Sequence, residues 1–290
     1  MILDKMSPLQ QRLIISAIGV FMMLIIIYLS PIPAFKPVFT LIIAAVIGVA
    51  MWEYYDIAHA KGLIPIKRLG IALASLYAVA VALSTQYPAA KELPEIALLF
   101  CLLGCFLYFF GSGSAPFTNL STTFFGIAYL AIPLSCMIRI AYFFSQSGPQ
   151  DGRWWLLYLI TVTKMTDTGG FFIGKRFGHN KLAPYISPKK TWEGAIGGLC
   201  LAVLTSIIIT ILASIFDNGA FQLNFWQSIW LGIWIGVLAQ CGDLAESLLK
   251  RDGGVKDSNQ LPGLGGMLDI TDSLVFTAPL VYIFLKIHAA

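Results

Sequence analysis

The chain has 290 residues, of which 58% are hydrophobic and 12% are charged, and its formal net charge is +4. A soluble domain carries about 25% charged residues, so this composition excludes an ordinary soluble protein. It also argues against nucleic-acid binding, because no basic domain stands outside the apolar segments. Long uncharged runs recur at 13–35, 69–90, 96–138, 194–216 and 218–242. A membrane-spanning helix needs about 20 apolar residues, and the runs are continuous rather than alternating. The sequence therefore predicts an all-α polytopic membrane protein.

The apolar segments predict nine spanning helices, at about 12–29, 37–55, 69–85, 95–110, 122–145, 154–173, 194–216, 226–249 and 270–287. A glycine- and serine-rich turn at 111–116 separates the fourth helix from the fifth. We divide the chain into residues 1–150, with about five transmembrane helices, and residues 151–290. The second part is a catalytic region with about four helices and cytoplasmic loops at 174–193 and 250–269. The two parts form one integral membrane unit.

Basic residues are distributed unequally between the two sides of this topology. If the N-terminus lies in the cytoplasm, thirteen of the nineteen Lys and Arg residues fall on the cytoplasmic side and four on the other. Cytoplasmic loops are enriched in Lys and Arg, so we expect a cytoplasmic N-terminus and a location in the cytoplasmic (inner) membrane. The basic face would then lie next to anionic lipid headgroups.

Six of the fifteen acidic residues lie between residues 240 and 273 of this apolar chain. Asp243 stands near the cytoplasmic end of the eighth predicted helix, and Ser247 and Lys250 follow on the same helical face. A carboxylate within a membrane helix is costly and by default indicates function. Glu246 is four residues from Lys250, and for Glu246 a surface ion pair at a helix end is the simpler interpretation.

Asp269 and Asp272 are three residues apart at the start of the ninth predicted helix, so both can face one point. Each alone is typical of a helix N-cap or first turn. Behind the glycine-rich segment 262–266 and opposite Asp243, they form a set of hard oxygen ligands. Such ligands suit Mg²⁺, which usually takes one or two carboxylates plus substrate phosphates and water. We therefore expect Mg²⁺ at Asp243 and Asp269, with Asp272 as the weaker third ligand.

The loop 174–194 holds five basic residues. Ser187 and Pro188 are typical of an N-cap and a first helical residue, which places Lys189 and Lys190 in a first helical turn. Cations are unfavourable there unless an anion joins them, so this loop predicts a phosphate site made of backbone N–H groups and two lysines. The alternative is that the loop is basic only because of the membrane topology.

Lys164 and Asp167 are one turn apart in the sixth predicted helix. An ion pair inside the membrane can be purely structural. The alternative is that Asp167 lines a polar cavity that opens to the cytoplasm, and both interpretations stay open at the level of sequence.

Several of these motifs resemble one known family. They are Gln240-x-Gly-Asp243-Leu-x-Glu-Ser247, then Lys250-Arg251 and Lys256-Asp257, and Pro262-Gly-x-Gly-Gly266-x-x-Asp269-x-x-Asp272. Upstream, Asp167-Thr-Gly, Gly174-Lys and Ser187-Pro-Lys-Lys-Thr-x-Glu193-Gly belong to the same pattern. Together they resemble the phosphatidate cytidylyltransferases (CDP-diacylglycerol synthases), over about residues 165–275.

The resemblance implies that the protein transfers CMP from CTP to phosphatidic acid in the bilayer, giving CDP-diacylglycerol and diphosphate. It also implies a homodimer. The distribution of Lys and Arg described above places the active site on the cytoplasmic side. The nucleophile is a phosphate monoester with a second pKa near 6, so no general base is required. The residues we expect to act are Asp243, Asp269 and Lys190 in catalysis, Asp243, Asp269 and Asp272 as ligands of Mg²⁺, and Lys189, Lys190, Ser247, Lys250, Arg251, Lys256 and Asp167 in substrate binding. The sequence leaves open whether a second cation accompanies the Mg²⁺.

Two positions depart from the family pattern. Leu264 stands where the family usually has His, and Ile270 stands where it usually has Arg. Since the acids and lysines remain, these departures bear on substrate preference and rate more than on reaction type.

Three other functions share some of these sequence features. A cytidylyltransferase for another lipid phosphate, such as an ether-linked one, would use the same residues. A CDP-alcohol phosphotransferase has acidic pairs like Asp269 and Asp272, but residues 273–275 break that family's pattern. A non-enzymatic transporter should carry its polar residues near the bilayer midplane and often shows internal repeats, whereas these residues cluster at one face and no repeat is visible.

Overall fold

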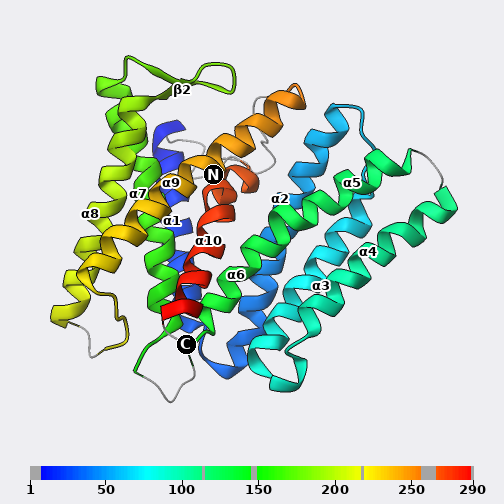
Figure 1. Cartoon of the computed structure of the whole chain (residues 1–290), viewed down its shortest axis with the longest axis horizontal. Helices are drawn as coiled ribbons and strands as arrows, with labels where there is room; N and C mark the ends of the chain where they lie inside the picture. Colours follow the sequence, from blue (N-terminus) through cyan, green and yellow to red (C-terminus); the bar gives the residue numbers. More distant parts are fainter. Residues whose placement is uncertain (1–7, 113–114, 145–148, 217–218, 256–265, 289–290) are drawn as a thin grey trace.

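The computed structural model describes residues 8–112, 115–144, 149–216, 219–255 and 266–288, which are almost entirely helical (Figure 1). Its helices are α1 (Pro8–Leu29), α2 (Lys36–Ala60), α3 (Lys67–Gln86), α4 (Leu93–Ser112), α5 (Pro116–Gly126), α6 (Ile132–Ala141), α7 (Gly152–Phe177), α8 (Trp192–Phe216), α9 (Phe225–Asp252) and α10 (Met267–His288). Short 3-10 turns occur at Pro33–Phe35 and Pro88–Ala90. A π-helical turn at Ile127–Ala131 joins α5 to α6.

Each predicted spanning segment coincides with a helix or, for α5 and α6, with one continuous helical rod. Seven of these rods are long and apolar enough to cross a membrane, by length and composition. They are α2, α3, α4, α5 with α6, α8, α9 and α10. The fold class, an all-α polytopic membrane protein, is thereby confirmed. The count of nine and the cytoplasmic N-terminus stay predictions.

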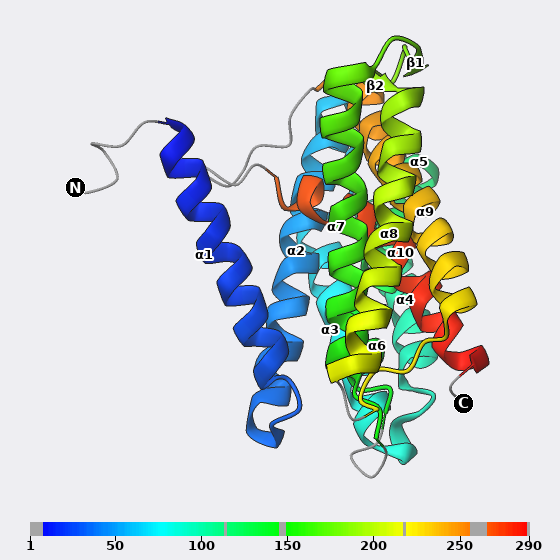
Figure 2. The same cartoon turned by 90° about the vertical axis from the view of Figure 1, so that its left-hand side faces the viewer.

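The two remaining helices are less apolar or shorter over their described part. In α7, Lys164, Asp167 and several threonines reduce the mean hydropathy. In α1, the apolar part is the shorter segment Ala17–Leu29. Figure 2 shows α1 at one side of the molecule, diverging from the other helices. Its C-terminal end is held where Arg153 donates to the Tyr28 carbonyl at 3.2 Å.

Small residues let the helices of the second half pack closely. A Cβ atom on Gly169 of α7 would lie 2.9 Å from the Gly197 carbonyl oxygen of α8, and one on Gly198 would lie 2.8 Å from the Thr166 carbonyl oxygen. Membrane helices use small residues in this way, because no hydrophobic effect drives them together in lipid and close packing must do so. Elsewhere the core is filled by fully buried side chains such as Ile47, Leu130 and Val275.

The segment before α8 forms a hairpin rather than a helical turn. Strands β1 (Lys181–Ala183) and β2 (Ser187–Thr191) pair antiparallel, so the predicted helix start at Ser187 and Pro188 is wrong. The helix begins at Trp192, where the Thr191 hydroxyl accepts the Gly194 N–H at 3.2 Å and acts as the N-cap. Proline is tolerated in an edge strand, so Pro188 fits β2 as well as a helix start.

Three side chains show how the hairpin is oriented relative to the rest of the chain. Glu193 accepts hydrogen bonds from the backbone N–H groups of His179 and Asn180, at 3.1 and 3.2 Å, which closes the hairpin onto α8. Alternate residues of a strand point to opposite sides: Lys189 is exposed and Lys190 is partly buried. The hairpin, the C-terminal end of α9 and the N-terminal end of α10 lie toward the same end of the molecule (Figure 1).

Candidate active site

Three carboxylates from two helices meet near this end of the molecule. Asp243 and Glu246 lie one turn apart on α9, and Asp272 lies in the second turn of α10. One oxygen of each lies within 4.8 Å of the others. Glu246 and Asp272 are buried, at 1% and 6% exposure, while Asp243 is partly exposed. The cluster is therefore open on the Asp243 side.

Gly242 brings the two helices together at this point. A Cβ atom on Gly242 would lie 2.3 Å from the carbonyl oxygen of Asp272, so any side chain here would force α9 away from α10. The glycine next to Asp243 is what allows the Asp243 and Asp272 carboxylates to come into one cluster.

The donor set fits a hard divalent cation. Three carboxylates at this spacing repel one another strongly where water is scarce, and a cation between them would relieve that repulsion. Glu246 Oε1 is buried and has no hydrogen-bond partner among the residues that the structure describes. Carboxylate oxygens are the protein ligands that Mg²⁺ prefers. The geometry thus suits Mg²⁺ at Asp243, Glu246 and Asp272.

Lys250 links this cluster to the remaining predicted ligand. Its ammonium lies 2.8 Å from Glu246 Oε2 and also pairs with Asp269 Oδ1. Asp269 additionally accepts the Gly266 N–H at 3.2 Å. Asp269 therefore adjoins Glu246 both directly and through Lys250, but it is not one of the three carboxylates whose oxygens all lie within 4.8 Å of one another. The expected surface pair of Glu246 and Lys250 does form, but it is buried, with side-chain exposures of 2% and 12%.

Basic residues border the open side of the cluster. Lys190 Nζ reaches from β2 to Asp243 Oδ2 at 2.7 Å, and Arg251 donates from α9 to the Ile186 carbonyl at 3.1 Å. These two contacts hold the hairpin against α9. Lys189 points to solvent and Ser247 is partly buried on α9. Lys256 and Leu264 lie outside the described residues.

A polar triad on α7 and α10 adjoins the cluster. Lys164 Nζ lies 3.2 Å from Asp167 Oδ2 and 3.1 Å from Ser273 Oγ, and the Ser273 hydroxyl lies 3.2 Å from Asp167 Oδ2. Ser273 directly follows Asp272, and both Lys164 and Asp167 are within electrostatic range of the Asp272 carboxylate. Asp167 therefore lies beside the carboxylate cluster. Lys164, which the sequence predicted only as the ion-pair partner of Asp167, also contacts Ser273 of α10.

Two further residues come from the N-terminal half, and sequence reasoning missed both. Glu53, on α2, is 1% exposed and accepts the N–H groups of Met267 and Leu268 at the start of α10. Its signal was available: a carboxylate in an apolar segment is costly. Tyr129 lies in the π-helical turn, a feature frequent at functional sites. Its buried hydroxyl has no hydrogen-bond partner within the described ranges, and nothing distinguishes it in sequence from the other ten tyrosines.

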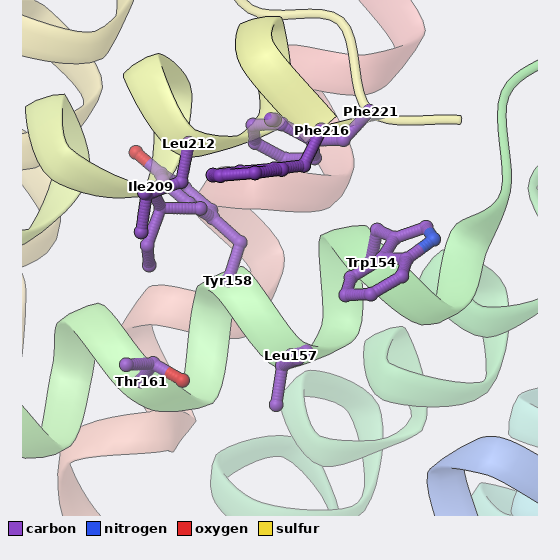
Figure 3. Close-up of a pocket in the computed structure, with 9 residues that line it drawn as sticks. Trp154, Leu157, Tyr158, Thr161, Ile209, Leu212, Phe216 and Phe221 are labelled. Atoms are coloured by element: carbon purple, nitrogen blue, oxygen red, sulfur yellow. The ribbon is translucent and has the colours of Figure 1, made fainter. Parts of the chain in front are cut away.

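An apolar groove of about 590 Å³ occurs elsewhere between α7 and α8 (Figure 3). Trp154, Tyr158 and Phe216 line it, with Leu157, Thr161, Ile209, Leu212, Ala213 and Phe221. All nine lining residues are uncharged, so this groove does not suit a phosphate-bearing substrate, and the acidic cluster is the candidate active site.

The sequence matches a known family over nearly its full length. The family model described as "Cytidylyltransferase family" covers residues 10–288. The chain belongs to this family. Among its relatives is a phosphatidate cytidylyltransferase of Chlamydia pneumoniae, 31% identical over 292 residues, covering 97% of this chain and 93% of the relative. The chloroplastic phosphatidate cytidylyltransferase 4 of Arabidopsis thaliana is 33% identical, covering 86% of this chain and 67% of the relative.

A third relative, from Staphylococcus haemolyticus, bears the same name. It is 40% identical over 156 residues, covering 52% of this chain and 58% of the relative. Membership of the cytidylyltransferase family confirms the resemblance stated above and makes the protein a nucleotidyltransferase. The cluster on α9 and α10 and the hairpin lysines lie inside the matched range.

Proposed function

We propose that the protein is a CTP:phosphatidate cytidylyltransferase, which makes CDP-diacylglycerol and diphosphate for phospholipid biosynthesis. The observation that carries this proposal is the family match over residues 10–288, which includes a buried carboxylate cluster bordered by lysines. Relatives named phosphatidate cytidylyltransferase in bacteria and in a plant support this choice of lipid substrate.

The reaction needs little covalent chemistry from the protein. An oxygen of the phosphatidate phosphate attacks the α-phosphorus of CTP, the bond from that phosphorus to the β-phosphate oxygen breaks, and diphosphate leaves. The attacking phosphate is already anionic at neutral pH. The site must therefore align two polyanions and offset their repulsion, which are the main contributions of proteins to phosphoryl transfer.

The residues divide this task by position. Asp243, Glu246 and Asp272 would hold Mg²⁺, with Asp269 close by on Lys250. When bound, the Mg²⁺ would neutralise charge on the triphosphate. Lys190 stands at the open side beside Asp243, where its ammonium can bind a phosphate of CTP. Further phosphate contacts are assigned to Lys189, Lys250, Arg251 and Lys256, with Ser247 and Asp167 orienting the substrates.

The site's place in the protein agrees with a substrate that stays in the bilayer. The cluster lies where α9 ends and α10 begins, beside a basic hairpin. We infer that this end faces the cytoplasm, the source of CTP, and that the protein resides in the inner membrane. The homodimer remains part of the proposal on the strength of the resemblance alone.

The test is an assay of purified protein in detergent with radiolabelled CTP, Mg²⁺ and phosphatidate. We expect a labelled CDP-lipid, and a loss of at least about 10²-fold in kcat for Asp243→Asn, since that change removes a ligand of the Mg²⁺ that would offset charge on the reacting phosphates. Asp56→Asn is the matched control, because Asp56 pairs with Lys67 between α2 and α3 and should keep wild-type turnover. Near-wild-type turnover in Asp243→Asn would refute the site assignment.

Other substrates in the same assay separate the remaining functions. Faster turnover of an ether-linked lipid phosphate would indicate the related cytidylyltransferase. Release of CMP from a CDP-lipid on adding an alcohol would indicate the phosphotransferase, and formation of CDP-lipid eliminates a simple transporter. Leu264→His and Ile270→Arg, run alongside, measure what the two departures from the family pattern do to substrate preference and rate.

A further inference from the structure

The first turn of α10 is capped by a residue from a distant helix. Gly266 occupies the N-cap position of α10 and has no side chain, so it cannot accept the N–H groups of the first turn as Ser, Thr, Asn or Asp would. Glu53 of α2 supplies the missing acceptors. Its Oε1 accepts the Met267 N–H at 2.9 Å and its Oε2 accepts the Leu268 N–H at 2.7 Å.

This contact is strong for three physical reasons. The hydrogen bonds are charge-assisted, which makes them stronger than bonds between neutral groups. The carboxylate lies at the positive end of the helix dipole. Glu53 is 1% exposed, so water can hardly replace either bond. A buried carboxylate is costly unless it is paired, and the two N–H groups provide that pairing.

The capped turn carries the acidic residues of the site. Asp269 follows Leu268 directly, and Asp272 lies one turn further along α10. Asp269 itself accepts the Gly266 N–H, so the N–H groups of residues 266, 267 and 268 are all directed at Glu53 or Asp269. A shift of this turn would move Asp269 and Asp272 relative to Asp243 and Glu246.

The end of α2 supports α9 as well as α10. A Cβ atom on Gly253, just past α9, would lie 2.9 Å from the Ile57 carbonyl oxygen of α2. Glu53 and Ile57 are one turn apart on α2. One stretch of α2 therefore contacts the start of α10 and the residue just past the end of α9, and these two helices supply the carboxylate cluster.

We propose that Glu53 is a positioning residue, which holds the start of α10 so that its carboxylates complete the cation site with Asp243 and Glu246. This inference rests on the proposed function for its role in catalysis. The coupling of Glu53 to a cation site does not depend on which lipid reacts.

The experiment uses the full chain in detergent and compares Glu53→Gln and Glu53→Ala with wild type. Mn²⁺ is the probe, and its dissociation constant is measured by electron paramagnetic resonance without substrates. We expect the Mn²⁺ Kd to rise about 10-fold in Glu53→Ala, the lower end for loss of an outer-shell partner, and less in Glu53→Gln, which keeps one acceptor oxygen. The Mg²⁺ concentration for half-maximal turnover should rise in parallel.

Two controls make the result specific. Asp56→Asn removes the next carboxylate on the same helix, which pairs with Lys67, and it should leave the Mn²⁺ Kd unchanged. Amide hydrogen exchange of the peptide that contains residues 267 and 268 should become faster in Glu53→Ala and stay slow in Asp56→Asn, because only Glu53 accepts those N–H groups.

The outcomes separate this inference from the proposed function. If Glu53→Ala and Glu53→Gln lower thermal stability but leave the Mn²⁺ Kd and the Mg²⁺ requirement at wild-type values, Glu53 is only structural and the inference is overturned. Absence of Mn²⁺ binding in wild type also overturns it. If wild type binds Mn²⁺ but makes no CDP-lipid, the proposed function fails while the Mn²⁺ measurements still decide the role of Glu53.

Discussion

Replacing Gly242 by alanine is the sharpest test of how the site is assembled. The substitution adds one methyl group where α9 meets α10, and it replaces none of the carboxylates, lysines or serines of the site. In the present geometry the new Cβ would lie 2.3 Å from the Asp272 carbonyl oxygen and 3.1 Å from the Ser273 Cα. Both neighbours are backbone atoms, so no side chain can rotate away.

The expected size of the effect on stability and on rate follows from the distance between the new Cβ and the Asp272 carbonyl oxygen. Real Cβ atoms essentially never come within 3.0 Å of such a neighbour, so α9 and α10 must separate by at least 0.7 Å at this point. Overpacking of this kind costs about 1–3 kcal/mol of stability. A misplacement of about 1 Å in a catalytic site can cost about 10²-fold in rate. We therefore expect kcat to fall about 10- to 10²-fold, with a higher Mg²⁺ requirement because Asp243 and Asp272 move apart.

The assay is CDP-lipid formation at varied Mg²⁺, together with thermal unfolding in detergent. Gly48→Ala is a neutral control, because its Cβ would make an ordinary contact of 3.5 Å with Ile71. Gly232→Ala is a packing control on the same helix: its Cβ would lie 3.0 Å from Ser206 Cβ and from Val203 Cα, at a different part of α9. It should lower thermal stability without changing the Mg²⁺ requirement.

The reasoning would be refuted by a Gly242→Ala protein with wild-type kcat and wild-type Mg²⁺ requirement. A loss of activity shared equally by Gly232→Ala would also count against it, since general loosening of α9 would then explain the effect.

Two further predictions concern the hairpin. Lys190→Gln should raise the KM for CTP while changing the free energy of unfolding by less than about 1 kcal/mol. The ion pair of Lys190 with Asp243 is partly exposed, and such pairs contribute little to stability. A large drop in the free energy of unfolding with an unchanged KM would show a structural role instead. Thr191→Ala should lower the free energy of unfolding by about 1 kcal/mol, because it removes the N-cap of α8. Thr191→Ser keeps the hydroxyl and should leave the free energy of unfolding unchanged. Denaturant unfolding of the two variants measures the difference.

The local sequence pattern was sufficient to predict the helices and the part of the site that lies on α9. Continuous apolar runs predict spanning helices because each residue must be apolar wherever the helix meets lipid. Helical periodicity places Asp243, Ser247 and Lys250 on one face of α9. It did not bring in Glu246, which the sequence assigned to a surface ion pair and which the structure places in the cluster. It was not sufficient for the hairpin, because Ser187 and Pro188 suit both a helix start and an edge strand, and the contacts of β2 with β1 and α9 decide between them.

The sequence by itself determined the membrane fold, the family resemblance and the end of the molecule where acids and lysines gather. Only the tertiary structure decided which acids share one point. Asp272 joins Asp243 because Gly242 lets α9 and α10 touch, while Asp269 lies beside the cluster, in contact with Lys250 and Glu246. It also showed that Glu53 caps a helix 214 residues further along the chain. Contacts between segments so far apart in the chain depend on how the helices pack, and the periodicity of one segment does not indicate which other segment it contacts.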